Sequence, residues 1–328
     1  MGEFFEKHFK LLKIGNITLS GNVLMAPLAG CTCFPFRLMA RRLGASLAFT
    51  EMTSADGLKY SDEATRKLLF TNELETPKAV QLLGSEPNIF EHACKSGYIE
   101  PFDIVDINMG CPVPNVIKSG EGCALMSKPE TAARIIEGCK RSGKIVTVKC
   151  RPGMSDNDIA IVEFAKICEN AGADMITVHG RTRNMMYSGE PLYDCITEAK
   201  SAVSIPVIAN GGIYSENDAV EMMRRTGADG VMLARYGFED PLIFSELSGK
   251  TPAQSKHELL TEQIEITQKY FDELFLLTYI KKLTSYFMKK RHGTKQYKQE
   301  LYRCGSAEEL RRIIDKIFTE CSEREERA

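Results

Sequence analysis

Between residues 22 and 245, short runs of apolar and β-branched residues alternate with longer segments of helical periodicity. Short runs of this kind are typical of buried strands, and their alternation with helical segments is typical of parallel sheets built from βα units. The sequence contains eight such runs: Val23–Ala26, Leu47–Thr50, Lys78–Leu83, Ile104–Asn108, Ile145–Lys149, Met175–Val178, Pro206–Ala209 and Gly230–Leu233. Eight βα units in about 225 residues predict an α/β fold, a single (β/α)8 TIM barrel.

A doubly wound sheet is the alternative architecture for the same alternation. A dinucleotide-binding sheet of that kind would carry GxGxxG after an early strand, and the sequence contains no such segment.

Several helix boundaries can also be predicted from the sequence. Ser127-Lys-Pro-Glu130 predicts a capping box that opens a helix ending at Gly143, and Ser215 predicts the start of another helix that closes before Gly227.

The pattern changes near residue 250, so we expect residues 1–245 to form the barrel and residues 250–328 to form a small all-α bundle. Apolar residues recur at helical spacing and predict a core-facing stripe: Leu276, Leu277, Ile280, Leu283 and Phe287. Ser306-Ala-Glu-Glu309 predicts a second capping box, before the last helix. We expect the Glu- and Arg-rich residues at the end of the sequence to be frayed.

The composition excludes several classes of protein. A net charge of −2 over 328 residues provides no global field for nucleic acid, so any RNA contact must come from a local basic patch. The eleven cysteines include no CxxC pair, and Cys31 and Cys33 lack metal-ligating partners nearby, so we interpret both as packing residues and expect no metal. Dispersed cysteines, and the absence of an apolar N-terminal or membrane-spanning segment, predict a cytoplasmic protein with no membrane partner. We also expect a monomer.

Polar residues stand at or just after the carboxyl ends of the predicted strands. They are Gln81, Asn108, Lys149, Arg151, His179, Arg181, Asn210 and Arg235. In a barrel of parallel strands these ends open into one mouth, where the active sites of such enzymes lie. We therefore expect residues far apart in the sequence, such as Gln81, Lys149 and His179, to converge there.

The last two strands predict a phosphate site. Gly211 and Gly212 allow backbone N–H groups to approach an anion closely, and Arg235 provides a charged fork for phosphate oxygens. The loops after strands seven and eight often bind phosphate in this fold. With Gln81 and Lys149 nearer the barrel axis, the site suits flavin mononucleotide (FMN). Gln81 would pair with the imide edge of the ring, and Lys149 would place positive charge near N1 and O2.

The segment Asn108-Met-Gly-Cys-Pro112 follows strand four, and Gly120 and Gly122 mark a flexible loop that could fold over it. An ordinary intracellular cysteine is a buried packing residue, but this setting favours a chemical role for Cys111. A free thiol has a pKa near 8.5 and is mostly protonated at neutral pH, which suits an acid better than a nucleophile.

Seven segments together closely resemble the tRNA-dihydrouridine synthases. They are Ala26–Gly30, Phe34–Arg37, Gln81–Gly84, Asn108–Pro112, Val148–Arg151, His179–Arg183 and Ile208–Gly212. The resemblance covers residues 10–245 in order, and the helical tail matches in kind. It implies FMN-dependent reduction of the C5–C6 bond of specific uridines in tRNA to 5,6-dihydrouridine, with NADPH or NADH as reductant. Hydride from flavin N5 would add to C6, and Cys111 would protonate C5.

The resemblance also implies a set of binding residues. FMN would be held by Pro27, Leu28, Ala29, Gln81, Lys149, His179, Asn210, Gly211, Gly212, Ala234 and Arg235. Independently of the resemblance, we expect RNA to contact Asn108, Arg151 and Arg181 in the barrel and Lys289, Lys290 and Arg291 in the tail. These tail residues belong to a basic side that runs from Lys281 to Arg303 and would bind the phosphates around a flipped base.

The sequence departs from the family pattern at two places. Cys33 replaces the usual acid before Pro-Phe-Arg, and Ala234-Arg235-Tyr236 replaces the more usual Gly-Arg-Gly or Gly-Arg-Ala. Two other functions stay open: an FMN-dependent oxidoreductase of free pyrimidines, of the dihydroorotate type, and a non-catalytic RNA-binding barrel. The basic tail argues against the first, and the complete set of polar strand ends argues against the second.

Overall fold

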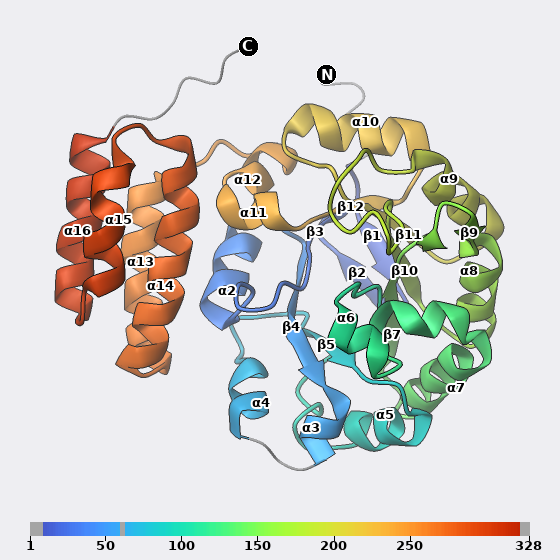
Figure 1. The fold of residues 1–328 in the computed structure, drawn as a ribbon. Coiled ribbons are helices and arrows are strands. Elements are labelled where there is room, and N and C mark those ends of the chain that lie inside the picture. Colours follow the sequence, from blue (N-terminus) through green and yellow to red (C-terminus); the bar gives the residue numbers. More distant parts are fainter. Residues whose placement is uncertain (1–8, 60–62, 322–328) are drawn as a thin grey trace.

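The computed structural model describes residues 9–59 and 63–321 and contains a closed barrel of eight parallel strands (Figure 1). The strands are β3 (Val23–Met25), β4 (Leu47–Ser54), β5 (Ala79–Leu83), β6 (Ile104–Met109), β7 (Ile145–Cys150), β10 (Met175–His179), β11 (Val207–Asn210) and β12 (Gly230–Leu233). Each pairs with its neighbour in sequence, and β12 closes the barrel on β3. The predicted TIM barrel is confirmed, and the largest boundary difference is the extension of β4 to Ser54.

The register of β6 and β7 shows how the barrel interior is layered. Ile104 pairs with Ile145, Asp106 with Thr147 and Asn108 with Lys149. The two isoleucines belong to an apolar cluster that fills the barrel at the amino ends of the strands. Because alternate residues of a strand point to the same side, the next two layers along these strands are polar. The barrel interior is therefore apolar at the amino ends of the strands and polar toward their carboxyl ends.

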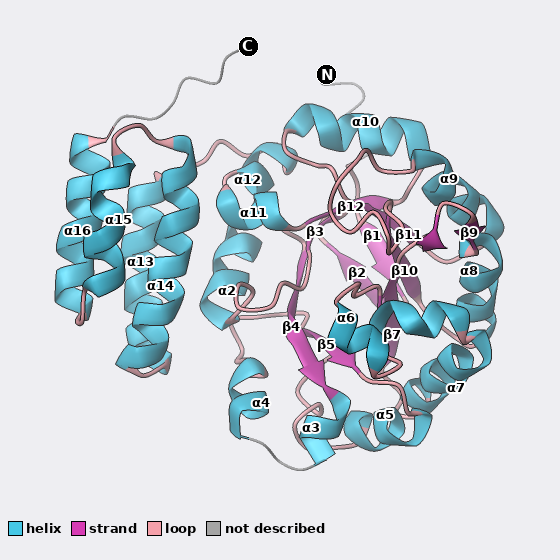
Figure 2. Cartoon of the chain, viewed as in Figure 1, coloured by secondary structure: helices cyan, strands magenta, loops and turns pink. Residues whose placement is uncertain are grey.

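Helices surround the barrel and connect consecutive strands (Figure 2). The longer ones are α2 (Phe34–Leu43), α5 (Pro87–Cys94), α7 (Pro129–Lys140), α8 (Ile161–Asn170), α9 (Tyr193–Ala202) and α10 (Glu216–Thr226). Shorter ones are α3 (Ala55–Lys59), α4 (Glu63–Leu68), α6 (Pro114–Lys118), η1 (Gly122–Ser127), α11 (Arg235–Glu239) and α12 (Ile243–Leu247). They cover the outward-facing apolar residues of the strands, such as Val105 and Ile107, in one continuous core.

Four short strands lie outside the barrel and were not predicted. β1 (Leu12–Ile14) and β2 (Ile17–Leu19) form an antiparallel hairpin. Its buried side chains join the apolar cluster inside the barrel, so the hairpin closes the amino end. β8 (Gly153–Ser155) and β9 (Asp158–Ile159) form a second hairpin in the loop after β7.

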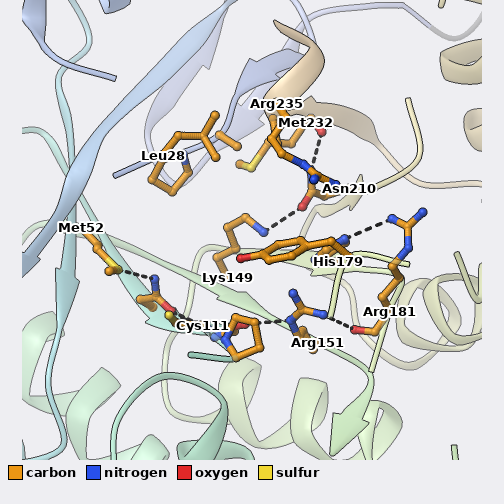
Figure 3. Close-up of a pocket in the computed structure, with 18 of the residues that line it drawn as sticks. Leu28, Met52, Cys111, Lys149, Arg151, His179, Arg181, Asn210, Met232 and Arg235 are labelled. Carbon is orange, nitrogen blue, oxygen red and sulfur yellow. Dashed lines mark hydrogen bonds between the residues drawn. The ribbon is translucent and has the colours of Figure 1, made fainter. Parts of the chain in front are cut away.

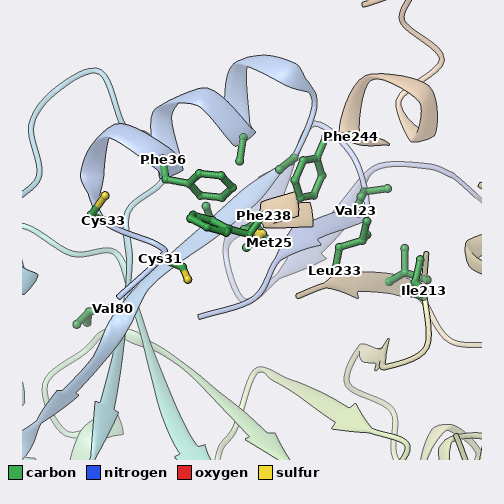
Figure 4. Close-up of a cluster of buried hydrophobic side chains, with 14 of the residues drawn as sticks. Val23, Met25, Cys31, Cys33, Phe36, Val80, Ile213, Leu233, Phe238 and Phe244 are labelled. Atoms are coloured by element: carbon green, nitrogen blue, oxygen red, sulfur yellow. The ribbon is translucent and has the colours of Figure 1, made fainter. Parts of the chain in front are cut away.

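The core between the barrel and α2 contains both cysteines of the C-x-C segment. Cys31 and Cys33 are buried, which confirms their interpretation as packing residues. Beside them the rings of Phe36 and Phe238 lie with their centroids 4.7 Å apart (Figure 4). Burying an aromatic side chain of this size stabilises a fold by about 1.5–3 kcal/mol. This core anchors the loop that follows β3.

Two of the predicted helix starts are confirmed and one is wrong. Ser215 accepts a 3.1 Å hydrogen bond from the N–H of Asp218, and Ser306 accepts one from Glu309. The carboxylate of Glu309 accepts a hydrogen bond from the N–H of Gly305, rather than from that of Ser306 as in a capping box. Ser127, by contrast, ends η1 and caps nothing, because α7 begins at Pro129 with Lys128 before it. Proline at the first helical position sets that start instead.

After α12 the chain forms a helical bundle beside α2, α11 and α12 (Figure 1). Its elements are α13 (Lys256–Tyr270), α14 (Glu273–Phe287), η2 (Met288–Lys290), η3 (Thr294–Gln296), α15 (Tyr297–Arg303) and α16 (Ala307–Glu320). The predicted stripe of α14 is buried except for Leu277, which is half-buried. Aromatic contacts and an ion pair of 2.9 Å between Lys256 and Asp240 join the bundle to the barrel. Within the described ranges no helix is both long and apolar enough to span a membrane.

Candidate active site

A pocket of about 270 Å³ opens at the carboxyl ends of the barrel strands (Figure 3). All the barrel residues predicted for the site line it: Pro27, Leu28, Ala29, Gln81, Asn108, Cys111, Lys149, Arg151, His179, Arg181, Asn210, Gly211, Gly212, Ala234 and Arg235. They come from strand ends and loops spread over more than 200 residues of sequence. The structure therefore brings together the residues that the barrel prediction expected to converge.

Lys149 lies on the inner side of the pocket and points toward β11. Its ammonium group donates a 2.9 Å hydrogen bond to Oδ1 of Asn210, whose own amide N–H group donates to the carbonyl of Met232 at 2.7 Å. Burial first, and then the charge of Arg151, lower the pKa of Lys149 to about 8, while Asp106 opposes the shift. At neutral pH Lys149 is thus positively charged. Its ammonium group is held in place by Asn210 of β11, which is itself bound to β12.

The electrostatics of the pocket favour an anion. Burial first, and then the charges of Lys149, Arg151, Arg181 and Arg235, hold the pKa of His179 well below its usual value, so this imidazole is neutral. Among the described residues that line the pocket, none is acidic. Several cations facing a shared cavity without a carboxylate are suited to a bound phosphate.

The turn after β11 has the backbone conformation that the phosphate prediction requires. Gly211 and Gly212 have φ angles of 111° and 72°, which residues with a Cβ rarely adopt. A side chain at Gly211 would also come within 2.5 Å of the His179 ring. On the neighbouring strand end, Arg235 stacks over Tyr187, with its guanidinium carbon 4.8 Å from the ring centroid. This contact holds Arg235 at the edge of the pocket.

Cys111 is half-buried at one wall of the pocket. Oδ1 of Asn108 accepts hydrogen bonds from the backbone N–H groups of Gly110 at 3.2 Å and Cys111 at 2.9 Å, which fixes the turn that carries the thiol. Burial raises the pKa of Cys111 above its ordinary value. The thiol is therefore protonated at neutral pH, as a proton donor must be.

The segment expected to be a flexible loop over Cys111 is instead folded into α6 and η1. The N–H of Cys123 donates a 3.1 Å hydrogen bond to the carbonyl of Cys111. Gly122 has a φ angle of 59°, and a Cβ there would lie 2.8 Å from that same carbonyl. The glycine is thus needed for close packing against Cys111 rather than for mobility.

Arg151 and Arg181 hold the loops around the pocket. Arg151, only 2% exposed, donates to the carbonyl of Gly110 at 2.8 Å and to those of Thr182 and Met186, both at 2.9 Å. Arg181 donates to the carbonyl of Gly189 at 2.8 Å and lies 3.4 Å from Nε2 of His179. Both side chains line the pocket while bracing its walls, and their predicted contact with substrate stays a prediction.

The predicted basic side of the tail needs correction at Arg291. Arg291 is buried, and its guanidinium donates to the carbonyl of Cys321 at 3.0 Å, so it is not part of an exposed basic surface. Lys289 is exposed, although it forms a 2.8 Å ion pair with Glu239 of the barrel. Lys281 donates to the carbonyl of Cys304 at 2.6 Å. The side chain of Lys290 lies outside the described part of the structure.

Three other basic residues of the tail also face solvent. Lys295, Lys298 and Arg303 are exposed on η3 and α15. They lie within the basic stretch that the sequence indicated, but not at the three positions chosen from it. We define these three residues as the α15 basic patch.

Sequence reasoning missed several residues of the site. Met52 contacts the Asn108 amide, and the partly exposed rings of Tyr187 and Tyr214 line the mouth of the pocket. Nothing in the local sequence marks these loop tyrosines. Asp106 is different, since it lies two residues before Asn108 on the same side of a predicted strand, and this period of two could have placed it under the pocket.

The closed parallel barrel and its pocket place the chain among TIM-barrel proteins, and solved structures agree on that fold. Histamine dehydrogenase from Rhizobium sp. 4-9 superposes with a TM-score of 0.59 at 13% identity, over 80% of this chain and 51% of that one. The structure of TcOYE with pHBA superposes with a TM-score of 0.56 at 13% identity, over 74% of this chain and 93% of that one.

The family model described as "Dihydrouridine synthase (Dus)" matches residues 24–327. A "Probable tRNA-dihydrouridine synthase" of Rickettsia conorii is 37% identical over 268 residues, which cover 80% of this chain and 81% of the relative. A "Probable tRNA-dihydrouridine synthase 1" of Synechocystis sp. is 33% identical over 94% of this chain and 90% of its own length. The chain belongs to the dihydrouridine synthase family and is an oxidoreductase.

Proposed function

We propose that this protein reduces specific uridines of tRNA to 5,6-dihydrouridine, with FMN as cofactor and NADPH or NADH as reductant, in the cytoplasm. The observation that carries the proposal is that a protonated thiol, Cys111, shares one pocket with Lys149 and with the cationic strand end at Arg235 where we predict a phosphate site. The printed names of the relatives support tRNA as the substrate.

The residues of the pocket fit FMN. Burial first, and then four nearby cations, depress the pKa of His179; a bound phosphate would neutralise part of that positive charge, and the glycine turn at Gly211 provides backbone next to it. Gln81 and Lys149 lie on neighbouring parts of the inner wall and would hold the ring system. Bound FMN would supply the hydride that adds to C6 of the uracil ring.

The protein's own contribution to the reaction is a proton at C5. Addition of hydride at C6 leaves negative charge on C5 and its carbonyl neighbour, and a neutral acid within reach must protonate that carbon. Cys111 meets this requirement because burial keeps its pKa above the ordinary value. Asn108 and Arg151 hold the backbone around the thiol, so the proton is delivered from a fixed position.

The proposal is tested with purified protein, FMN, NADPH and an unmodified tRNA transcript, followed by nucleoside mass spectrometry. We expect a gain of two hydrogens on specific uridines and no turnover with free uracil or orotate. Turnover of orotate alone would favour the free-pyrimidine oxidoreductase. Binding of tRNA by a protein that retains no flavin would favour a non-catalytic RNA-binding barrel.

A further inference from the structure

A buried carboxylate lies directly below the pocket, on the strand that leads to Cys111. Asp106 is 0% exposed and takes no part in the chemistry described above. Its Oδ1 accepts a 2.6 Å hydrogen bond from the Thr147 hydroxyl, and its Oδ2 accepts a 2.7 Å bond from the amide of Gln81. A carboxylate removed from water is costly unless it is hydrogen-bonded, so its retention in the barrel interior requires an explanation.

From Asp106 a chain of hydrogen bonds continues upward to the thiol-bearing turn. Oε1 of Gln81 accepts from the amide N–H group of Asn108 at 2.9 Å. Oδ1 of Asn108 then accepts from the backbone N–H of Cys111 at 2.9 Å. We refer to Thr147, Asp106, Gln81, Asn108 and the Cys111 backbone as the Asp106 chain.

The direction of every bond in this chain is set at its two ends. An ionised carboxylate only accepts hydrogen bonds, and a backbone N–H only donates them. The Gln81 amide must therefore turn its NH2 group toward Asp106, and the Asn108 amide must turn its oxygen toward Cys111. Either amide alone could flip, because its two ends are nearly the same shape.

We propose that Asp106 is a positioning residue that fixes the orientation of the Gln81 amide in the pocket wall and, through Asn108, holds the turn that carries Cys111. The inference rests on the proposed function, since Gln81 is assigned to the flavin. A second effect follows from charge. Asp106 lies near enough to Lys149 to influence its titration, so its negative charge partly offsets the positive charge that Lys149 presents to the pocket.

Three full-length variants separate these roles. Asp106→Leu removes both the charge and the acceptor, whereas Asp106→Asn removes the charge but keeps an oxygen for Gln81. Thr177→Val is the matched control, because Thr177 is equally buried inside the barrel and its hydroxyl has no hydrogen-bond partner in the described structure. The measurements are iodoacetamide labelling of Cys111 by peptide mass mapping, FMN affinity, and the midpoint potential of the bound flavin.

For Asp106→Leu we expect FMN affinity to fall about tenfold, and Cys111 in the flavin-free protein to be labelled about fivefold faster, as loss of a hydrogen bond predicts. For Asp106→Asn we expect nearly normal labelling and a raised midpoint potential, because removing a negative charge favours the more negative reduced flavin. Thr177→Val should change none of these values.

The outcomes distinguish this inference from the proposed function. Asp106→Leu with wild-type labelling and wild-type FMN affinity would overturn it, since an apolar replacement that merely fills space leaves both unchanged. If Asp106→Leu does not fold, Asp106→Ala takes its place, and wild-type labelling of Cys111 together with wild-type FMN affinity in that variant would overturn the inference. If the wild-type protein binds no flavin, the proposed cofactor is wrong, and the labelling rates of the flavin-free variants still decide the role of Asp106.

Discussion

The backbone N–H of Cys111 donates a 2.9 Å hydrogen bond to Oδ1 of Asn108, so a residue near the carboxyl end of β6 also fixes the residue that carries the thiol. Because this hydrogen bond is made by the backbone of Cys111, it positions the residue without involving the thiol side chain. A substitution at the thiol should therefore remove proton donation without disturbing the wall of the pocket.

Cys111→Ala separates the two half-reactions. Reduction of the flavin by NADPH should be nearly unchanged, because hydride transfer to flavin requires no thiol. Reduction of tRNA should fall by about 10²–10⁴, the contribution typical of a general acid. Stopped-flow bleaching of the flavin, followed by turnover with tRNA, measures both steps. Normal reduction of tRNA by Cys111→Ala would show that another group donates the proton.

Arg235→Ala should weaken FMN retention, because Arg235 is the charged fork at the predicted phosphate site. A hydrogen bond to a charged group contributes about 1.5–3 kcal/mol, so we expect FMN to bind about 10- to 100-fold more weakly. Fluorescence titration of the flavin-free protein measures this affinity. Arg225→Ala is the control, since Arg225 also stacks on a tyrosine but lies outside the pocket. Equal affinities in the two variants would remove Arg235 from the phosphate site.

Replacing the α15 basic patch, Lys295, Lys298 and Arg303, together with Ala should weaken binding of tRNA. Each lost phosphate contact lowers the slope of log K against log salt by about 0.7–0.9, so three contacts should flatten it by about 2. Filter-binding titrations at several salt concentrations measure the slope. Lys166→Ala with Arg224→Ala, on barrel helices α8 and α10, is a control for general charge. An unchanged slope would place the RNA on another surface.

Arg291→Ala should act on stability rather than on RNA affinity, because the guanidinium is buried against the carbonyl of Cys321. Leaving a buried acceptor without its partner costs about 1–3 kcal/mol. Urea denaturation measures this loss in the free energy of unfolding. A variant with wild-type stability and weakened tRNA binding would restore the original prediction that Arg291 contacts RNA.

The titration of Asp106 makes stability depend on pH. Burial raises the pKa of Asp106 from 3.8 to about 6. The folded protein then holds this proton more tightly than the unfolded chain, so the contribution of Asp106 to stability falls as pH rises through that interval. The difference between these two pKa values corresponds to ~3 kcal/mol in the free energy of unfolding. Urea denaturation of Asp106→Asn and the wild type at pH 4.5, 5.5 and 7 should show the variant gaining relative stability with pH. Parallel curves would contradict the raised pKa.

The sequence was sufficient to predict the barrel and most of its pocket. Eight apolar runs with helical segments between them left few alternatives to a closed parallel sheet. Once that fold is predicted, Gln81, Lys149 and His179 must converge, because the carboxyl ends of all its strands meet in one mouth. Cys111 could also be chosen from the strand, glycine and proline that surround it.

The tertiary structure alone decided which polar groups are paired. Arg291 looked like part of a basic surface but is buried on a carbonyl, and Ser127 looked like a helix cap but ends a 3-10 helix. The Asp106 chain also depends on contacts between neighbouring strands. Local sequence determines periodicity and therefore elements and faces. The partner of a charged or amide side chain depends on what packing brings within about 3 Å, and that distance is set only when the whole chain is folded.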